Sequence, residues 1–216
     1  NRNMRIRVHQ EYFQTILYRD IVERHDIPHP KALIDLAHWL VENAASQYSI
    51  NKLTGYLKAL GYNVPKTSVA QYIEWLEDSF FLFTVNLYDA SLARRNTNPK
   101  RIYCVDHALV SSIASGILVN SGHLLENLVF AALRRQYANI FYLKTKTGRE
   151  VDFVIPQKGK KTLLVQRREI LEDQQTRKRK DTYLKDAMSA LEKSLGIITT
   201  RYEEEKVKTD AVMLTT

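Results

Sequence analysis

The stretch that decides the fold is Glu150-Val151-Asp152-Phe153-Val154-Ile155, an apolar run interrupted by one carboxylate. Its β-branched and aromatic residues predict a strand. Similar short runs at Ile140 to Leu143 and Thr162 to Arg167 flank it, separated by turns at Gly148 and Gly159. The pattern therefore predicts three consecutive strands, with Asp152 on the face opposite Val151 and Phe153.

Helices are expected on both sides of these strands. Leu124 to Tyr137 has apolar residues at helical spacing, and a highly charged helix is expected from Thr176 to Leu195. Gly196 comes next, between this helix and the expected strands at Ile197 to Thr200 and Ala211 to Leu214. The second half therefore has the predicted order αβββαββ.

The first half is predicted to be helical, with a short hairpin at its end. Helices are expected at Glu11 to His25, from Pro30 onward, from a Ser49 cap to Gly61, and from a cap at Thr67 or Ser68. The last two, joined by a turn, are typical of a helix-turn-helix. Strands at Phe80 to Leu87 and Arg101 to Val105 then flank a basic loop, as the wing of a winged helix would.

A break between Gly116 and Gly122 separates the two halves. We therefore expect a helical and winged-helix-like region at 1–116 and an αβββαββ domain at 117–216. The fold class is α+β or α/β.

The net charge of +8 is concentrated in clusters. The clustered basic residues are Arg94, Arg95, Lys100, Arg101, Lys158, Lys160, Lys161, Arg167, Arg168, Arg177, Lys178, Arg179 and Lys180. Such clusters indicate a polyanion partner, although solvated helix faces give the same pattern.

The second helix of the helix-turn-helix carries residues that favour DNA binding and residues that oppose it. Lys66, Thr67, Ser68 and Gln71 near its start suit phosphates and base edges. Farther along, the acidic residues Glu74, Glu77 and Asp78 would repel DNA. Insertion into a groove and packing against another protein module are both consistent with this helix.

Several classes of protein are disfavoured. The apolar runs are too short to span a bilayer, and the charged opening with Arg2, Arg5 and Arg7 is unlike a signal peptide and indicates a fragment of a longer chain. The lone Cys104 and six dispersed histidines predict no disulfide and no zinc site, which favours the cytoplasm. No Gly-Lys-Ser/Thr occurs, so we expect no ATP binding by these residues.

Glu126 in the first helix of the second half, Asp152, and the strand pair Gln166 and Arg168 form a layout that could converge. The surrounding sequence resembles a domain of unknown function at the C-terminus of prokaryotic AAA+-like ATPases. The resemblance rests on Tyr12-Phe13-Gln14-Thr15, Tyr18 to Arg24, Trp75 to Asp78, Pro99 to Asp106, Gly122 to Phe130, Phe141 to Ile155, Leu164 to Gln166 and Gln175 to Arg179.

That resemblance implies a PD-(D/E)XK nuclease-like fold in the second half, with ATP bound only by an ATPase segment that precedes Asn1. It also implies that Glu126, Asp152 and Gln166 would hold Mg²⁺ or Mn²⁺. Where the family has a lysine this chain has Arg168, which cannot act as a general base, and Gln166 brings no charge.

Three functions follow as hypotheses. The first is a DNA-interacting accessory module of the ATPase, with a degenerate nuclease-like site. The second is an active Mg²⁺-dependent nuclease. The third is a protein-interaction module that couples the ATPase to a partner.

Overall fold

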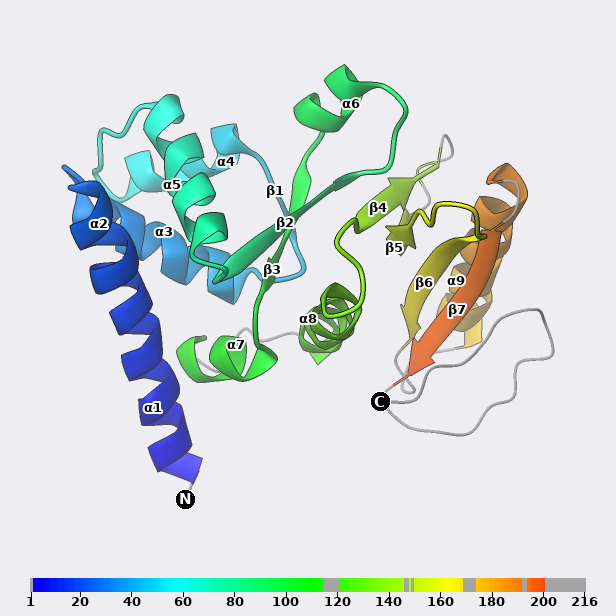
Figure 1. Ribbon diagram of the computed structural model, residues 1–216, viewed down its shortest axis with the longest axis horizontal. Coiled ribbons are helices and arrows are strands. Elements are labelled where there is room, and N and C mark those ends of the chain that lie inside the picture. The colour runs from blue at the N-terminus through cyan, green and yellow to red at the C-terminus, as the bar shows by residue number, and fades with distance from the viewer. Residues whose placement is uncertain are drawn as a thin grey trace. The chain divides into compact units, whose positions relative to one another are not determined.

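The computed structural model describes residues 2–114, 121–145, 148, 150–168, 174–191 and 194–200. Over these residues the chain is a mixture of helices and strands (Figure 1), as expected for an α+β protein. It divides into two compact units. The first contains Asn1–Thr84 and Pro99–Ala131, and the second contains Val85–Asn98 and Ala132–Thr216.

The first unit opens with one continuous helical run made of α1 (Arg2–Thr15), the π-helical segment η1 (Ile16–Val22) and α2 (Glu23–His25). It ends at Asp26, whose φ of 47° is left-handed. The predicted helix is confirmed, but it begins nine residues earlier than Glu11. Those earlier residues are mostly exposed and include Arg2, Arg5 and Arg7, so the segment has few of the core-facing apolar residues on which the prediction depended.

Three helices follow: α3 (Pro30–Glu42), α4 (Ile50–Ala59) and α5 (Lys66–Asp78). The Ser49 side chain accepts a hydrogen bond from the Lys52 amide at 3.3 Å, which confirms the predicted cap. The predicted cap at Thr67 or Ser68 is wrong, because α5 already begins at Lys66 after the extended residue Pro65. Pro65 is the N-cap residue and makes no side-chain hydrogen bond to the helix. Its ring fixes its own φ, which holds the backbone in place at the start of α5.

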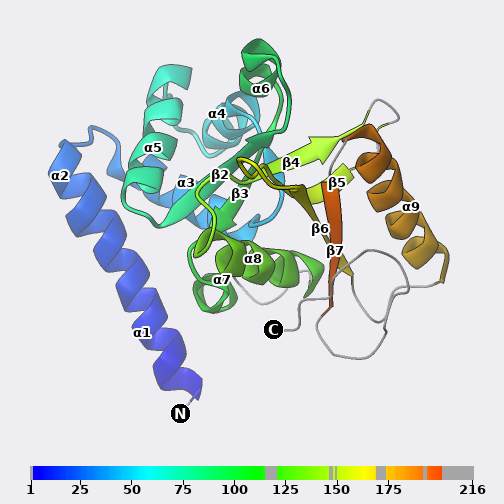
Figure 2. The ribbon, with the colours of Figure 1, turned by 45° about the vertical axis from the view of Figure 1, so that its right-hand side comes forward.

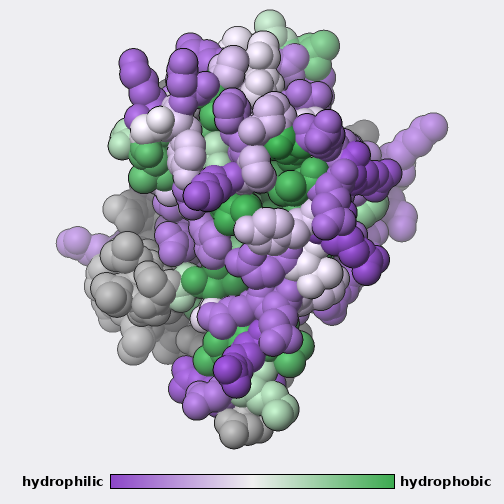
Figure 3. All heavy atoms as spheres, turned by 90° about the vertical axis from the view of Figure 1, so that its left-hand side faces the viewer, coloured by the Kyte–Doolittle hydropathy of each residue, from purple (hydrophilic) through white to green (hydrophobic). Residues whose placement is uncertain are grey.

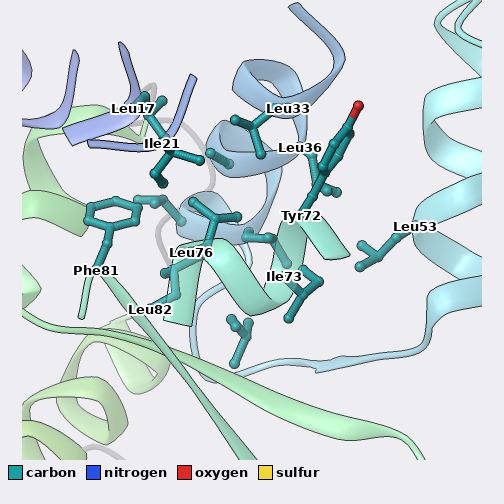
Figure 4. Close-up of a cluster of buried hydrophobic side chains, with 14 of the residues drawn as sticks. Leu17, Ile21, Leu33, Leu36, Leu53, Tyr72, Ile73, Leu76, Phe81 and Leu82 are labelled. Carbon is teal, nitrogen blue, oxygen red and sulfur yellow. The ribbon is translucent and has the colours of Figure 1, made fainter. Parts of the chain in front are cut away.

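The core of this unit forms where these helices meet. Leu33, Leu36, Leu53, Tyr72 and Leu76 belong to one buried cluster. Figure 4 shows these side chains converging on α5 from the neighbouring helices. Burial of so many aliphatic groups is the main driving force for folding this unit.

The first unit also holds β1 (Gln47–Tyr48), the start of β2 (Leu82–Leu87), β3 (Lys100–Cys104), α7 (His107–Ile113) and the first residues of α8 (Ser121–Arg134). β1 pairs with β3 in antiparallel orientation. The predicted strands of the hairpin are confirmed as β2 and β3. The connection between them contains the short helix α6 (Leu92–Thr97), whose first turn is capped by Ser91.

The second unit is built on β4 (Phe141–Lys144), β5 (Glu150–Ile155), β6 (Thr162–Arg168), α9 (Gln174–Ala190) and β7 (Ser194–Thr200). β4, β5 and β6 are antiparallel neighbours, while β7 is parallel to β6, and the end of β2 is parallel to β4. The strand order among the described residues is β1-β3-β2-β4-β5-β6-β7. Of the predicted αβββαββ order, the elements through β7 are present, and Ala211 to Leu214 lies outside the described residues.

The predicted position of Gly196 between helix and strand is wrong, since Gly196 lies inside β7 and is paired with Leu164. Helix α9 contacts β6 and β7 (Figure 2). A Cβ atom on Gly196 would stand 2.7 Å from the Met188 sulfur and 3.1 Å from Leu184 Cδ2. The glycine therefore permits close packing of the helix on the strand, and it does not end the helix.

No helix within the described ranges is both long and apolar enough to cross a membrane.

We predict that Gly196→Ala lowers the free energy of unfolding by about 1 kcal/mol, because the Met188 and Leu184 side chains must move to admit the methyl group. A matched control is Gly55→Ala in α4, where nothing lies within 4 Å of the added atom. That variant should gain about 0.5–1 kcal/mol from helix propensity. Urea unfolding followed by circular dichroism measures both, and a stabilised Gly196→Ala would contradict the packing.

Candidate functional site

Asp152 and Gln166 are cross-strand neighbours in the second unit. The antiparallel register of β5 and β6 pairs Phe153 with Val165, so the next step along brings Asp152 opposite Gln166. Both polar side chains are buried. The adjacent strand residues Val151, Phe153 and Val165 are apolar and buried, whereas Arg167 is half-buried.

The carboxylate of Asp152 accepts two N–H groups on its Oδ2 atom. The Gln166 Nε2 atom donates at 2.7 Å, and the Arg167 backbone amide donates at 2.9 Å. Because a carboxylate can only accept, the nitrogen of the Gln166 amide must face Asp152. The other amide atom, Gln166 Oε1, is buried and has no hydrogen-bond partner within the described part of the chain.

The fourth residue of the predicted layout, Arg168, lies at the end of β6, and its side chain is outside the described residues. The structure thus brings Asp152 and Gln166 together. Where the described residues extend, no group of three or more His, Cys, Asp or Glu is arranged to hold a metal ion.

Glu126 belongs to the first unit, where it forms a buried ion pair. Its Oε1 atom accepts from Arg101 Nη1 at 2.9 Å and from the Tyr103 hydroxyl at 2.7 Å. The side chains of Arg101 and Glu126 are only 8% and 4% exposed. Two charges taken so far out of water need each other, since removal of one partner leaves an uncompensated buried charge.

Tyr103 completes this cluster. Burial, and then the neighbouring Glu126 carboxylate, raise the pKa of its phenol well above the usual range. The phenol therefore stays protonated and donates its hydrogen bond at neutral pH. The Tyr103 ring also stacks on Phe130 of α8, with centroids 4.3 Å apart.

The next residue of α8, Asn127, binds the backbone of β3. Its Oδ1 accepts from the Cys104 amide at 2.8 Å, and its Nδ2 donates to the Cys104 carbonyl at 3.1 Å. Burial raises the pKa of the Cys104 thiol to about 12, so this cysteine remains a protonated apolar group. Glu126 and Asn127 together fasten α8 to β3.

The sequence did not predict these contacts of Glu126 and Asn127 with β3. Glu126 was assigned to a metal and Arg101 to nucleic acid, because each was considered within its own segment. A weak signal was present, since Arg101 and Tyr103 alternate on one strand and therefore share a face.

The predicted nucleic-acid residues are distributed over both units. On α5, Lys66 and Gln71 are exposed and Ser68 is half-buried. In the β2–β3 connection Arg94 is exposed and pairs with Asp89 at 3.2 Å. Arg95 and Lys100 are half-buried.

Arg177, Lys178, Arg179 and Lys180 lie in α9, and their side chains are outside the described residues. Basic residues that the structure does show exposed in the second unit include Lys158, Lys160 and Lys161. These three lie between β5 and β6.

Comparisons with known proteins give two matching families. Residues 1–118 match the Domain of unknown function (DUF8612), and residues 121–215 match the Domain of unknown function (DUF4143). The uncharacterized protein MJ1544 of Methanocaldococcus jannaschii is 32% identical over 167 residues, which are 76% of this chain and 37% of that protein. The aligned part is thus little more than a third of that relative. No solved structure matches.

We predict that Glu126→Ala lowers the free energy of unfolding by about 3–5 kcal/mol, because Arg101 would be left buried without its counter-charge. Glu74→Ala, an exposed acid on α5, is the matched control and should change it by less than about 0.5 kcal/mol. Metal-free urea unfolding makes the comparison. Equal stabilities of the two variants would mean that Glu126 has no structural role.

Proposed function

The chain belongs to the family of the Domain of unknown function (DUF8612), and from that premise we propose that it is a DNA-backbone-binding accessory module of a longer ATPase, with a nuclease-like domain that has lost cleavage. The observation that carries the loss of cleavage is the Gln166 to Asp152 hydrogen bond. The rest of the proposal depends on charge and on the length of the relative.

The order of elements supports the nuclease-like part of the proposal. A helix, three antiparallel strands, a second helix and a strand parallel to β6 follow one another from α8 to β7. In a PD-(D/E)XK nuclease-like arrangement the second of these strands carries the metal-binding aspartate. The third strand carries the glutamate or glutamine of the motif. Asp152 and Gln166 occupy those strands.

The residues present do not fit a catalytic Mg²⁺ ion. Mg²⁺ prefers several oxygen ligands in strict octahedral geometry. Asp152 Oδ2 instead accepts two N–H groups, and Gln166 turns its amide nitrogen, which cannot ligate a cation, toward that carboxylate. The Glu126 Oε1 atom already accepts from Arg101 and Tyr103, and a positive guanidinium beside a carboxylate weakens its attraction for a cation.

Charge supports DNA as the partner of the second unit. Lys158, Lys160 and Lys161 are exposed together in the β5–β6 connection, and Arg94 is exposed in α6. Exposed lysines and arginines bind phosphates without reading sequence. We leave Arg101 out of these proposed phosphate contacts, because its guanidinium is buried against Glu126.

The length of the archaeal relative supports the proposal that this module is part of a longer protein. The aligned part is 37% of that archaeal protein, and this chain has no Gly-Lys-Ser/Thr phosphate loop. We therefore place ATP binding and hydrolysis outside residues 1–216, in a segment to which this module is attached.

We predict that the chain binds duplex DNA with an affinity that falls steeply with salt, with a log–log slope of about −0.9 per phosphate contact. Arg94→Glu should weaken binding to all sequences alike. Arg19→Glu in the first unit is the control with the same change in net charge, since the Arg19 and Arg94 side chains are 77% and 69% exposed. Fluorescence anisotropy at several salt concentrations measures these affinities. Equal losses of affinity in the two variants, or binding that is independent of salt, would contradict phosphate binding through Arg94.

We predict no Mg²⁺-dependent cleavage of DNA by the unmodified chain and a gain of metal dependence in Gln166→Glu. The substitution sets two buried carboxylates side by side, and such a pair must share a proton or a cation. Without metal the variant should therefore unfold more easily, and Mg²⁺ should restore its stability. Gln166→Ala is the control, because it also loses the hydrogen bond but adds no charge.

Thermal unfolding with and without Mg²⁺ and a plasmid-nicking assay give the two measurements. Robust cleavage by the unmodified chain that is lost in Asp152→Ala would replace this proposal with an active nuclease.

A further inference from the structure

Phe80 combines two unfavourable features. It lies in the turn between α5 and β2 with φ of 55°, in the left-handed region that side chains other than glycine rarely adopt. Its side chain is nevertheless 68% exposed to solvent. A strained backbone that holds an aromatic ring in water costs stability in the isolated molecule, and such a feature is a sign of function.

The surroundings of Phe80 are acidic. Glu74 and Asp78 on α5 are exposed. Glu77, by contrast, accepts hydrogen bonds on its Oε1 atom from the Thr84 amide at 2.8 Å and from the Thr84 hydroxyl at 2.6 Å. No lysine or arginine occurs between Gln71 and Tyr88. A nucleic acid would be repelled here, so an apolar protein surface with basic residues at its margin fits Phe80 best.

Such a surface exists on α1 of the same unit. Met4, Val8 and Tyr12 are 67%, 55% and 57% exposed and follow one another at intervals of four residues, which places them on one helix face. A different face of α1 packs on the body of the unit through buried Phe13 and through His9, whose Nδ1 lies 2.9 Å from Ser112 Oγ. We call Met4, Val8 and Tyr12 the α1 stripe.

Arginines border the α1 stripe. Arg2, Arg5 and Arg7 are exposed, and Glu11 is the single acid between Arg2 and Thr15. Figure 3 views the side of the molecule from which α1 projects in Figure 1, and hydrophobic surface there is interspersed with strongly hydrophilic surface. An exposed apolar stripe with basic flanks is complementary in polarity and charge to Phe80 and its acids.

We propose that the α1 stripe of one molecule receives Phe80 of a second copy of this chain. Charge selects this pairing over the two symmetric ones. Phe80 against Phe80 would bring the acids Glu74 and Asp78 of both copies together, and the parallel pairing of two α1 helices would oppose their arginines. The cross-pairing sets the arginines of one copy against the acids of the other.

The two surfaces differ, so the contact is heterologous and leaves one unused surface on each member of a pair. Contacts of this kind continue into a ring or an open chain of molecules. This self-association goes beyond DNA binding and uses other residues, so each can be tested without the other.

Sedimentation velocity of the whole chain at increasing concentration tests the proposal. The unmodified chain should form oligomers larger than a dimer. Phe80→Gly and Val8→Asp should each weaken the association by at least about 30-fold, as loss of a central anchor does. Leu60→Asp, another exposed apolar residue of the first unit, is the control and should still associate.

An equimolar mixture of the two variants gives the decisive result. Phe80→Gly keeps an intact α1 stripe and Val8→Asp keeps an intact Phe80, so the mixture should form a one-to-one dimer and grow no further. Thermal unfolding should show Phe80→Gly to be at least as stable as the unmodified chain, because glycine adopts a positive φ without strain. A monomeric unmodified chain, oligomers in either variant alone, or a mixture that stays monomeric would overturn the proposal.

Discussion

The buried pair of Arg101 and Glu126 is the interaction on which the rest of the structure depends. Two charges in a dry environment cost several kcal/mol each to desolvate, and only a close partner and further hydrogen bonds offset that cost. Their 2.9 Å contact, together with the Tyr103 hydroxyl, meets this requirement. The pair therefore fixes where helix α8 must lie on strand β3.

The residues that form this cluster come from the segments matched by both families. Arg101, Tyr103 and Cys104 lie within residues 1–118, whereas Glu126 and Asn127 lie within residues 121–215. All five belong to the first compact unit. The helix that a nuclease-like domain would use to present an acid is thus part of the packing of the first half.

The same principle explains the state of Asp152 in the second unit. Its Oδ2 atom accepts hydrogen bonds from the Gln166 side chain and from the Arg167 backbone amide. Asp152 and Glu126, the two acids proposed above for a metal site, therefore both accept hydrogen bonds from fixed groups of the protein. Beside this carboxylate, Gln166 Oε1 is buried without a hydrogen-bond partner among the described residues.

Local patterns were enough to predict much of the fold and little of the site. The Ser49 cap and the β5 bounds, Glu150–Ile155, could be predicted because short-range periodicity and hydrogen bonds decide them. Gly196 was misjudged because its role depends on Met188 and Leu184 of the helix packed against it. The partner of Glu126 is 25 residues away in the sequence, and no local pattern identifies such a contact.

Amide hydrogen exchange at Cys104 tests the central claim most directly. Its amide donates to the Asn127 side chain, so it reports whether α8 stays on β3. If the ion pair holds these elements together, this amide should exchange only through global unfolding, with a free energy equal to that from urea denaturation. Exchange through a local opening several kcal/mol below the global value would show that α8 leaves β3 readily, and would contradict the account.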